Sequence, residues 1–492
     1  MSGNLRQKTI TGISWSLIDN LAYQGVAFIV GIIIANFVSP EEYGQLGIIL
    51  LFIALFNSIV DSGFSNALIR KKDANNVDYC TVFIVNFSTS VGLYVLLFFT
   101  SPSIASFFHK SELDLLLKVT GIIIIINAIT IIQKTILVKS IDFKTQAKAS
   151  LIASLLSGIV GIITAVIGLG VWSLVIQQIL RQILYTLVIW FFSKWYPKFV
   201  FSLVSLKDLF GFGWKLMIVG IIDTAWNELN QVIIGRYYKM YALGQYTRSK
   251  QFSDGVTYGL LTVIQRVSYP SLSAVQEDDE RLLHVLRKIL KMTMFVLTPC
   301  ILGLAACAEA LLNVLIGPQW SDAAFYLQLI CISIILSPLR ILDQNILQVK
   351  KDSGTLLILN IVGKAFAVVP IIIGIFVSIE AMLIATAVVT YIFTTPLTII
   401  YSTKKYLGYG ILGHLIDLSK IIAPSFFMSI VVYSVVFLGM NDYMTLVCQI
   451  LSGIICFVVI CRIIRIEEYN DLKLIVLSYL KKICGTRCDK WN

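Results

Sequence analysis

The sequence predicts an all-α integral membrane protein with about fourteen transmembrane helices, organised as two parallel, pseudo-symmetric six-helix lobes and two further C-terminal helices. Three observations lead to this fold class: an apolar composition, apolar runs of helix length along the whole chain, and an internal repeat. Of the 492 residues, 57% are hydrophobic and only 14% are charged, whereas about 25% of the residues in a soluble domain are charged. Together with a mean hydropathy of +0.85, this composition excludes a soluble globular protein.

Apolar runs of about 20 residues, each long enough to cross a hydrocarbon core of about 30 Å as a helix, recur from end to end. Helices are expected rather than barrel strands, because strict alternation of apolar and polar residues is missing. The first run is too long for a signal peptide, so we interpret it as a retained helix. The predicted spans are 13–38, 46–68, 80–100, 115–138, 150–168, 171–192, 214–235, 249–270, 290–315, 324–347, 354–377, 379–401, 418–438 and 444–463.

The distribution of basic residues predicts the orientation of these spans. Most of the 39 Lys and Arg residues fall in connections on the side of the N-terminus or in the C-terminal tail. This bias places both termini in the cytoplasm. One outer connection departs from the rule, since the stretch IIGRYYKMYALGQYTRSK at 233–250 contains four cations, whereas the corresponding SPEEYGQLG at 39–47 contains two carboxylates and no cation.

An internal repeat predicts the organisation into lobes. The segment GISWSL at 12–17 resembles GFGWKL at 211–216, and YGQL at 43–46 resembles LGQY at 243–246. Six spans separate the copies, so both have the same membrane orientation, which predicts two parallel lobes with a cleft between them. The predicted parts are an N-terminal lobe at 1–205, a C-terminal lobe at 206–405, two extra helices at 406–465 and a basic cytoplasmic tail at 466–492.

Several charged residues fall well inside apolar runs, where a lipid-facing charge would cost at least about 2.5 kcal/mol. They are therefore expected to face the cleft or one another. Arg181 and Lys364 lie near the middle of their spans and would either bind phosphate or form buried ion pairs. The complete set of deep charged residues is Asp19, Asp61, Arg181, Asp223, Glu228 and Lys364.

Other polar residues in the spans have a structural alternative. Asp223, Asn227 and Asn230 or Gln231 follow helical spacing and would form one polar stripe, which either lines a cavity or makes interhelical hydrogen bonds. Charged residues near inner span ends are expected to extend toward the headgroups, namely Lys134 and Arg340, of which Arg340 could also pair with Asp343. Arg266 approaches an inner end as well, and His109, His284 and His414 are interpreted as surface or interface residues.

Longer segments resemble a known family. FGFGWKLMIVGIIDTAWNELNQVIIGRYYKMYALGQYTRSKQF, followed by VSYPSLSAVQEDDERL and LIGPQWSDAA, is similar to the Wzx-type polysaccharide flippases. The resemblance covers nearly the whole chain and includes SPEEYGQLG and DSGFSNALIRK in the first half. It is strongest to the lipopolysaccharide-exporter branch of the MOP exporter superfamily, which also contains the MATE transporters.

The resemblance implies a two-lobed carrier that moves an undecaprenyl-pyrophosphate-linked oligosaccharide from the inner to the outer leaflet of the bacterial inner membrane. Polysaccharide polymerase or assembly proteins would be partners, together with membrane lipids, and neither an enzymatic activity nor a cofactor, metal or nucleic acid is implied. The residues expected to bind the phosphates or the glycan are Arg181, Lys364, Arg236, Arg248, Lys250 and Arg266, because fixed cations offset phosphate charge in a low-dielectric core. Asp19, Asp61, Asp223 and Glu228 are candidates for coupling a proton or Na⁺.

Two alternative functions remain open at the level of sequence. A multidrug cation exporter of the same superfamily would be expected to have an acidic, aromatic cavity rather than deep cations. A scaffold subunit of an envelope-assembly complex would instead pair its buried charges and transport nothing. No P-loop motif occurs, which argues against ATP-driven transport by this chain alone.

Overall fold

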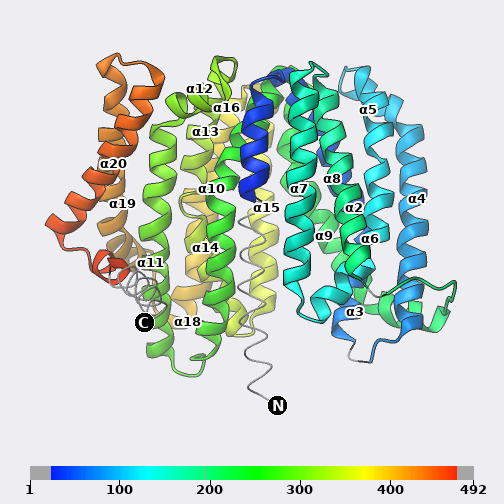
Figure 1. Cartoon of the computed structure of the whole chain (residues 1–492). Helices are drawn as coiled ribbons and strands as arrows, with labels where there is room; N and C mark the ends of the chain where they lie inside the picture. Colours follow the sequence, from blue (N-terminus) through cyan, green and yellow to red (C-terminus); the bar gives the residue numbers. More distant parts are fainter. Residues whose placement is uncertain (1–23, 62, 72, 194, 474–492) are drawn as a thin grey trace, which may run out of the picture. The chain divides into compact units, whose positions relative to one another are not determined.

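A computed structural model of the chain describes residues 24–61, 63–71, 73–193 and 195–473, which are helical with short connections and contain no strand (Figure 1). Contacts between residues divide the chain into two compact units, Met1–Arg248 and Ser249–Asn492. The lobe boundary expected between residues 205 and 206 stays a prediction. The first predicted span is described only from Gln24, and the end of the predicted tail lies outside the described residues.

The first unit contains nine helices within the described residues, followed by the first two turns of a tenth. The helix Gln24–Ala35 precedes the labelled elements of Figure 1. The others are α2 (Pro40–Asp61), α3 (Phe64–Arg70), α4 (Asn76–Phe107), α5 (Glu112–Thr120), α6 (Ile122–Lys139), α7 (Phe143–Val166), α8 (Val171–Phe192) and α9 (Leu203–Tyr237), and α10 (Met240–Ser273) crosses the boundary between the units.

The second unit continues with helices that alternate between long spans and short broken pieces. The span Ile379–Leu407 includes two π-helical turns, which are rare and widen the helix locally. The elements are α11 (Asp279–Ala306), α12 (Ala308–Ile316), η1 (Pro318–Trp320), α13 (Ser321–Ile334), α14 (Ser337–Val349), α15 (Ser353–Phe376), α16 (Ile379–Val389), η2 (Thr390–Thr394), α17 (Thr395–Ile399), η3 (Ile400–Lys404), α18 (Lys405–Leu407), α19 (Ile411–Ser434), η4 (Val435–Leu438) and α20 (Asp442–Ile464).

The predicted spans coincide with helices of the structure. Among the described residues, 11 helices are long and apolar enough to cross a membrane, and 12 if α9, bent by 53° near Gly211, is one span. The two remaining predicted spans correspond to the shorter helix Gln24–Ala35 and to α10, which is less apolar over its length than the other long helices. Because α10 already begins at Met240, most of the basic stretch is helical rather than a loop.

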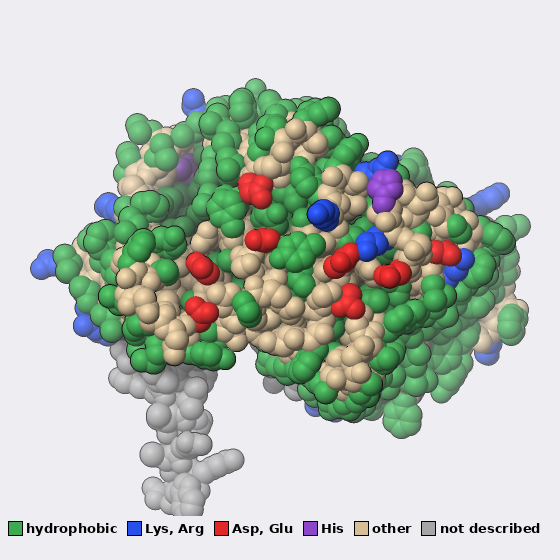
Figure 2. Space-filling model, turned by 90° about the horizontal axis from the view of Figure 1, so that it is seen from above, with side chains coloured by type: hydrophobic (Ala, Val, Ile, Leu, Met, Phe, Trp, Pro, Cys, Tyr) green, Lys and Arg blue, Asp and Glu red, His purple; other side chains and the backbone are tan. Residues whose placement is uncertain are grey.

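Exposed side chains on the long helices are mainly apolar, as a lipid environment requires. Large exposed hydrophobic residues occur along α4, α7, α15, α19 and α20, for example Phe99, Ile163 and Ile454. Figure 2 shows one end of the molecule, where Asp, Glu, Lys and Arg gather on the end face while hydrophobic side chains cover the flanks. This distribution identifies a multi-pass membrane protein.

The internal repeat is visible in the way corresponding helices begin. Asp142 caps α7 by accepting hydrogen bonds from Thr145 N at 3.1 Å and from Thr145 Oγ1 at 2.7 Å. Asp352 caps α15 by accepting the same two bonds from Thr355, at 3.0 and 2.7 Å. The residue before each Asp has a positive φ, 60° at Ile141 and 59° at Lys351. These helices are the fifth and eleventh predicted spans, so the shared local structure supports the repeat.

A second correspondence lies inside the first unit, where the start of α10 crosses α2. A Cβ atom on Gly44 would lie 2.1 Å from the Met240 carbonyl oxygen, and a Cβ atom on Gly244 would lie 1.7 Å from the Pro40 carbonyl oxygen. The two contacts are reciprocal and involve residues exactly 200 positions apart in the repeat. Only glycine allows two helix backbones to approach this closely.

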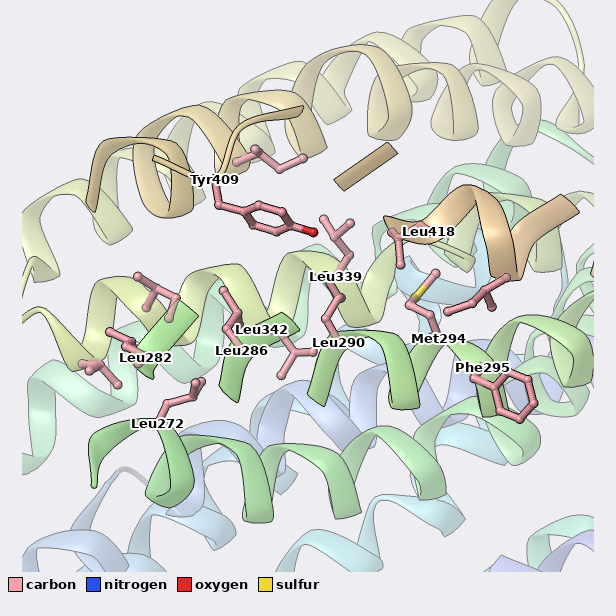
Figure 3. Close-up of a cluster of buried hydrophobic side chains, with 14 of the residues drawn as sticks. Leu272, Leu282, Leu286, Leu290, Met294, Phe295, Leu339, Leu342, Tyr409 and Leu418 are labelled. Atoms are coloured by element: carbon pink, nitrogen blue, oxygen red, sulfur yellow. The ribbon is translucent and has the colours of Figure 1, made fainter. Parts of the chain in front are cut away.

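The second unit has a large apolar core at one end, formed by α10, α11, α14, α19 and α20. Figure 3 shows Leu272, Leu282, Leu286 and Leu290 facing Leu339 and Leu342, with Tyr409 and Leu418 in the same cluster. The spacing of Leu282, Leu286 and Leu290 places them on one face of α11. This core holds α14 and α19 against α11.

Candidate functional site

A polar cavity of about 850 Å³ lies within the first unit. It is bordered by α2, α3, α6, α7, α8 and α9, so that six elements contribute side chains. Each of the spans among them is long enough to cross the hydrocarbon core. A cavity that is lined by polar groups inside a membrane protein is expected to contain water.

The charged residues that line this cavity are Asp61 from α2, Lys134 from α6 and Arg181 from α8. Lys134 is exposed, and its ammonium forms no ion pair or hydrogen bond among the described residues. Asp61 is also exposed and accepts a hydrogen bond from the Ser65 hydroxyl at 2.5 Å, while Arg181 is half-buried. With two cations and one carboxylate, the lining carries a positive formal charge.

Neutral hydrogen-bonding groups surround these charges. Asn127 Nδ2 on α6 donates to Asn57 Oδ1 on α2 at 3.0 Å, which fixes two amides at the cavity wall. Thr130 on α6 shares a hydrogen bond of 2.6 Å with Thr186 on α8. Several other residues add hydroxyl and amide groups to the lining: Ser58, Asn66, Thr135, Gln146, Ser150, Ser154, Gln182, Tyr185 and Thr224.

The interruption of the helix between α2 and α3 shapes one wall of the cavity. Gly63 has a φ of 66°, a left-handed conformation that glycine adopts without strain. A Cβ atom there would lie 2.5 Å from the Gly213 carbonyl oxygen and 2.8 Å from Leu216 Cβ. Gly63 therefore lets α9 approach closely, and Asp61, Ser65 and Leu216 all line the cavity beside it.

The seventh predicted span, α9, contributes less to the cavity than its polar stripe suggested. Thr224 lines it, but Asp223 and Glu228 are not among the lining residues. Glu228 accepts a hydrogen bond from Gln231 one turn further along the same helix, and Asn230 Nδ2 lies 3.5 Å from the Tyr246 hydroxyl. Of the four carboxylates proposed for ion coupling, Asp61 lies in the cavity, and Asp19 falls outside the described residues.

The basic stretch at 233–250 is divided between the two units. Arg236 donates to the Phe107 carbonyl at 2.6 Å and to His109, and its guanidinium lies 4.8 Å from the centre of the Phe107 ring. Arg236 therefore supplies a hydrogen-bond donor to a carbonyl group at the C-terminal end of α4, where carbonyls lack partners within the helix. Arg248 is only 4% exposed and lies 5.2 Å from the centre of the Tyr43 ring. Their binding roles stay predictions.

The remaining predicted site residues belong to the second unit. Lys250 is half-buried near the start of that unit, and Lys364 is half-buried on α15. Two residues after Lys364, Phe366 stacks on Phe393 of the π-helical turn η2, with ring centres 5.0 Å apart. Arg266 is on α10, and the placement of its side chain lies outside the described residues.

The sequence interpretation missed Lys134 as a cavity residue, although a signal was present. Asn127, Thr130 and Lys134 follow i, i+3, i+7 spacing on α6 and so lie on one face. His414, interpreted as a surface or interface residue, is not at the surface, because it is 2% exposed, and it contacts Asp343. Among the described residues, Asp343 pairs with His414 and not with Arg340, the partner that the sequence offered as an alternative.

Comparison with known proteins identifies the family. Residues 33–325 match the model of a family described as "Polysaccharide biosynthesis protein". The chain belongs to this family. Relatives include the succinoglycan biosynthesis transport protein ExoT of Rhizobium meliloti (strain 1021), 26% identical over 68% of each chain. The teichuronic acid biosynthesis protein TuaB of Bacillus subtilis (strain 168) is 25% identical over 72% of this chain and 76% of its own.

A further relative of this family member is the lipopolysaccharide biosynthesis protein WzxC of Escherichia coli (strain K12), 24% identical over 67% of each chain. Among solved structures, the lipid II flippase MurJ in an inward closed conformation has a TM-score of 0.71 and 17% identity, and the match covers 94% of this chain and 99% of MurJ. An inward-facing MATE transporter has a TM-score of 0.57 and 17% identity, over 84% of this chain and 98% of its own. These likenesses establish an all-α membrane transporter fold.

Proposed function

We propose that this protein is a flippase that moves a polyprenyl-pyrophosphate-linked oligosaccharide from the cytoplasmic to the outer leaflet for the synthesis of a cell-surface polysaccharide. It acts as a carrier rather than an enzyme. The names of three relatives, which are biosynthesis or transport proteins for succinoglycan, teichuronic acid and lipopolysaccharide, support the substrate class. The family assignment supports the role in polysaccharide biosynthesis.

The observation that carries this proposal is the cation-rich cavity of the first unit. Lys134 and Arg181 can bind a pyrophosphate through charge-assisted hydrogen bonds, and the planar guanidinium of Arg181 can do so with two parallel bonds. Amides and hydroxyls such as those of Asn57 and Gln182 suit the many hydroxyl groups of a glycan. A cavity with a positive formal charge would repel the cationic substrates of a multidrug cation exporter.

The proposed direction of transport follows from the positive-inside rule. We place both termini on the cytoplasmic side of a bacterial inner membrane, because most Lys and Arg residues lie in segments on the same side as the termini. Substrate would enter the cavity at the basic inner end. Arg236, Arg248, Lys250, Lys364 and Arg266 are kept as proposed contacts along the remaining path, and the coupling ion is a proton or Na⁺.

Depletion of the protein tests the proposed function in cells. When synthesis of this protein is switched off, lipid-linked oligosaccharide is expected to accumulate and to stay inaccessible to an impermeant periodate reagent that oxidises only sugars on the outer face. Surface polysaccharide should fall in parallel. Restoring the wild-type gene should reverse both effects. Undiminished surface polysaccharide, or an accumulated intermediate that is already on the outer face, would contradict the proposal.

A further inference from the structure

The apolar core of the second unit encloses a pair of titratable side chains that the proposed cavity does not use. His414 Nε2 on α19 lies 3.4 Å from Asp343 Oδ1 on α14, and the two side chains are 2% and 0% exposed. The surrounding core includes Leu342, Ile346 and Tyr409, all nearly inaccessible, and Figure 3 shows several of these side chains. Burying this pair is costly, which makes it a candidate for function.

The hydrogen bonds of the imidazole fix how many protons the pair holds. His414 Nδ1 lies 3.0 Å from the Gly410 carbonyl oxygen, which can only accept, so Nδ1 carries a hydrogen. The contact between Nε2 and Asp343 Oδ1 is then attractive only if one more proton lies on either atom. Asp343 Oδ2 is buried without a hydrogen-bond partner among the described residues. The packed state therefore requires one bound proton.

Loss of that proton would leave a buried carboxylate facing the lone pair of a neutral imidazole. Such an unpaired charge in an apolar core costs several kcal/mol. Both α14 and α19 pack against α11, and the pair is a polar contact that joins α14 and α19 directly. Separation of α14 from α19 would admit water to Asp343 and remove this penalty.

Three groups near the pair, Tyr409, Asp417 and Arg287, bind one another. The Tyr409 ring lies 3.9 Å from the centre of the His414 ring, and its hydroxyl donates to Asp417 Oδ2 at 2.7 Å. Burial, followed by the Asp417 carboxylate, raises the pKa of Tyr409, which keeps it a donor. Arg287 binds Asp417 with two bonds of 2.6 and 2.8 Å. The titratable groups on the elements around the pair include Arg340, Lys404, Lys405, Tyr406, Tyr409, Asp417, Lys420, His284, Arg287, Lys288, Lys291 and Cys461.

We propose that Asp343 and His414 form a proton-binding site, and that release of its proton unlocks α14 from α19 at this end of the second unit. Arg287 and Lys291 also line a separate cavity of about 320 Å³, together with Lys288 and Asp471, which brings solvent close to the network. The proton passes from the pair to water that enters as the helices separate. The end of the second unit that carries Arg287, Lys288 and Lys291 is the proposed cytoplasmic end. The deprotonated state is therefore the one that opens toward the cytoplasm.

Hydrogen exchange measured on the purified full chain in lipid nanodiscs tests the site without any substrate. Peptides from α14 and from the start of α19 are compared between wild type and Asp343→Asn as the pH is raised from about 5 to about 9. The Asn amide donates to His414 Nε2 at every pH, so it mimics the proton-bound state. Relative to this variant, wild-type exchange should rise by up to about tenfold per pH unit, the slope of a one-proton reaction.

Two further variants make the result decisive. Asp442→Asn, which changes an exposed acid at the start of α20 in the same unit, should follow wild type. His414→Gln supplies a permanent donor to Asp343, so loss of the proton no longer leaves the Asp343 carboxylate without a hydrogen bond from residue 414, and exchange should rise less with pH than in wild type. The test therefore survives if Asp343→Asn does not fold. If wild type and both pair variants show the same exchange at every pH, the pair is a structural contact and the inference fails.

The use of the proton in transport rests on the proposed function and has its own readout. In cells, Asp343→Asn should accumulate normally in the membrane but lose most surface polysaccharide, and the residual export should not respond to collapse of the pH gradient by nigericin. Normal, gradient-sensitive export by this variant would overturn the coupling role. Absence of export activity in the wild type would instead overturn the proposed function and leave the exchange result standing.

Discussion

Replacement of Lys134 and Arg181 together by Gln is expected to abolish export of the polysaccharide while the protein level in the membrane stays near that of wild type. Both residues line the cavity of the first unit, and Lys134 forms no ion pair among the described residues. A hydrogen bond to a charged group contributes about 1.5–3 kcal/mol. Each single variant should therefore weaken binding about tenfold to hundredfold.

Exchange of each cation for the other separates charge from shape at this site. Lys134→Arg and Arg181→Lys keep the positive charge and should retain part of the export, with Arg181→Lys the weaker because it loses two-bond recognition. Lys118→Gln, which removes a cation that pairs with Asp114 outside the cavity, should export normally. Full export by the double Gln variant would show that these cations do not bind the substrate. Loss of the protein from the membrane would indicate a structural role.

Gly244→Ala is expected to destabilise the protein strongly, because its Cβ would lie 1.7 Å from the Pro40 carbonyl oxygen. The obstructing atom belongs to the backbone of α2, so no side-chain rotation relieves the contact, and α2 and α10 must move apart. Overpacking of this kind costs about 1–3 kcal/mol and in some cases more. Gly44→Ala should have a similar effect, since its Cβ would lie 2.1 Å from the Met240 carbonyl oxygen.

The thermal midpoint of the purified protein in detergent measures this effect. Gly92→Ala is the matched control, because Gly92 lies inside α4 and its added Cβ would have nothing within 4 Å. That variant should be as stable as wild type or slightly more stable, since Ala favours a helix over Gly by about 1 kcal/mol. Equal midpoints for Gly244→Ala and wild type would mean that the close crossing of α2 and α10 does not exist.

Much of the fold could be predicted from the sequence because membrane-spanning helices have a strong and local signal. Each predicted span coincides with a helix described at least in part. The similarity of YGQL and LGQY likewise corresponds to a real structural relation, the reciprocal contact of Gly44 and Gly244. Helix ends were less predictable. The polar start of α10 was taken for a loop, since hydropathy does not distinguish a polar helix from a connection.

The candidate site was predictable only in part, because the sequence does not say which face of a helix meets which neighbour. Arg181 and Asp61 were predicted as deep polar residues, and both line the cavity. Lys134 was assigned to the headgroup region from its distance to the span end, although its helical face is polar. His414 and Asp343 are 71 residues apart, and nothing local in the sequence relates them.

Reconstitution tests the central claim, that the protein itself translocates the lipid-linked oligosaccharide, most directly. The purified chain is placed in liposomes with lipid-linked oligosaccharide extracted from depleted cells, and periodate outside the vesicles measures how much glycan becomes accessible. With wild-type protein, oxidation should go beyond the outer-leaflet fraction and approach completion, whereas protein-free liposomes and liposomes with the Lys134→Gln, Arg181→Gln protein should stop at that fraction. Oxidation that stops at the outer-leaflet fraction with correctly folded wild-type protein, with or without an imposed pH or Na⁺ gradient, would contradict the account.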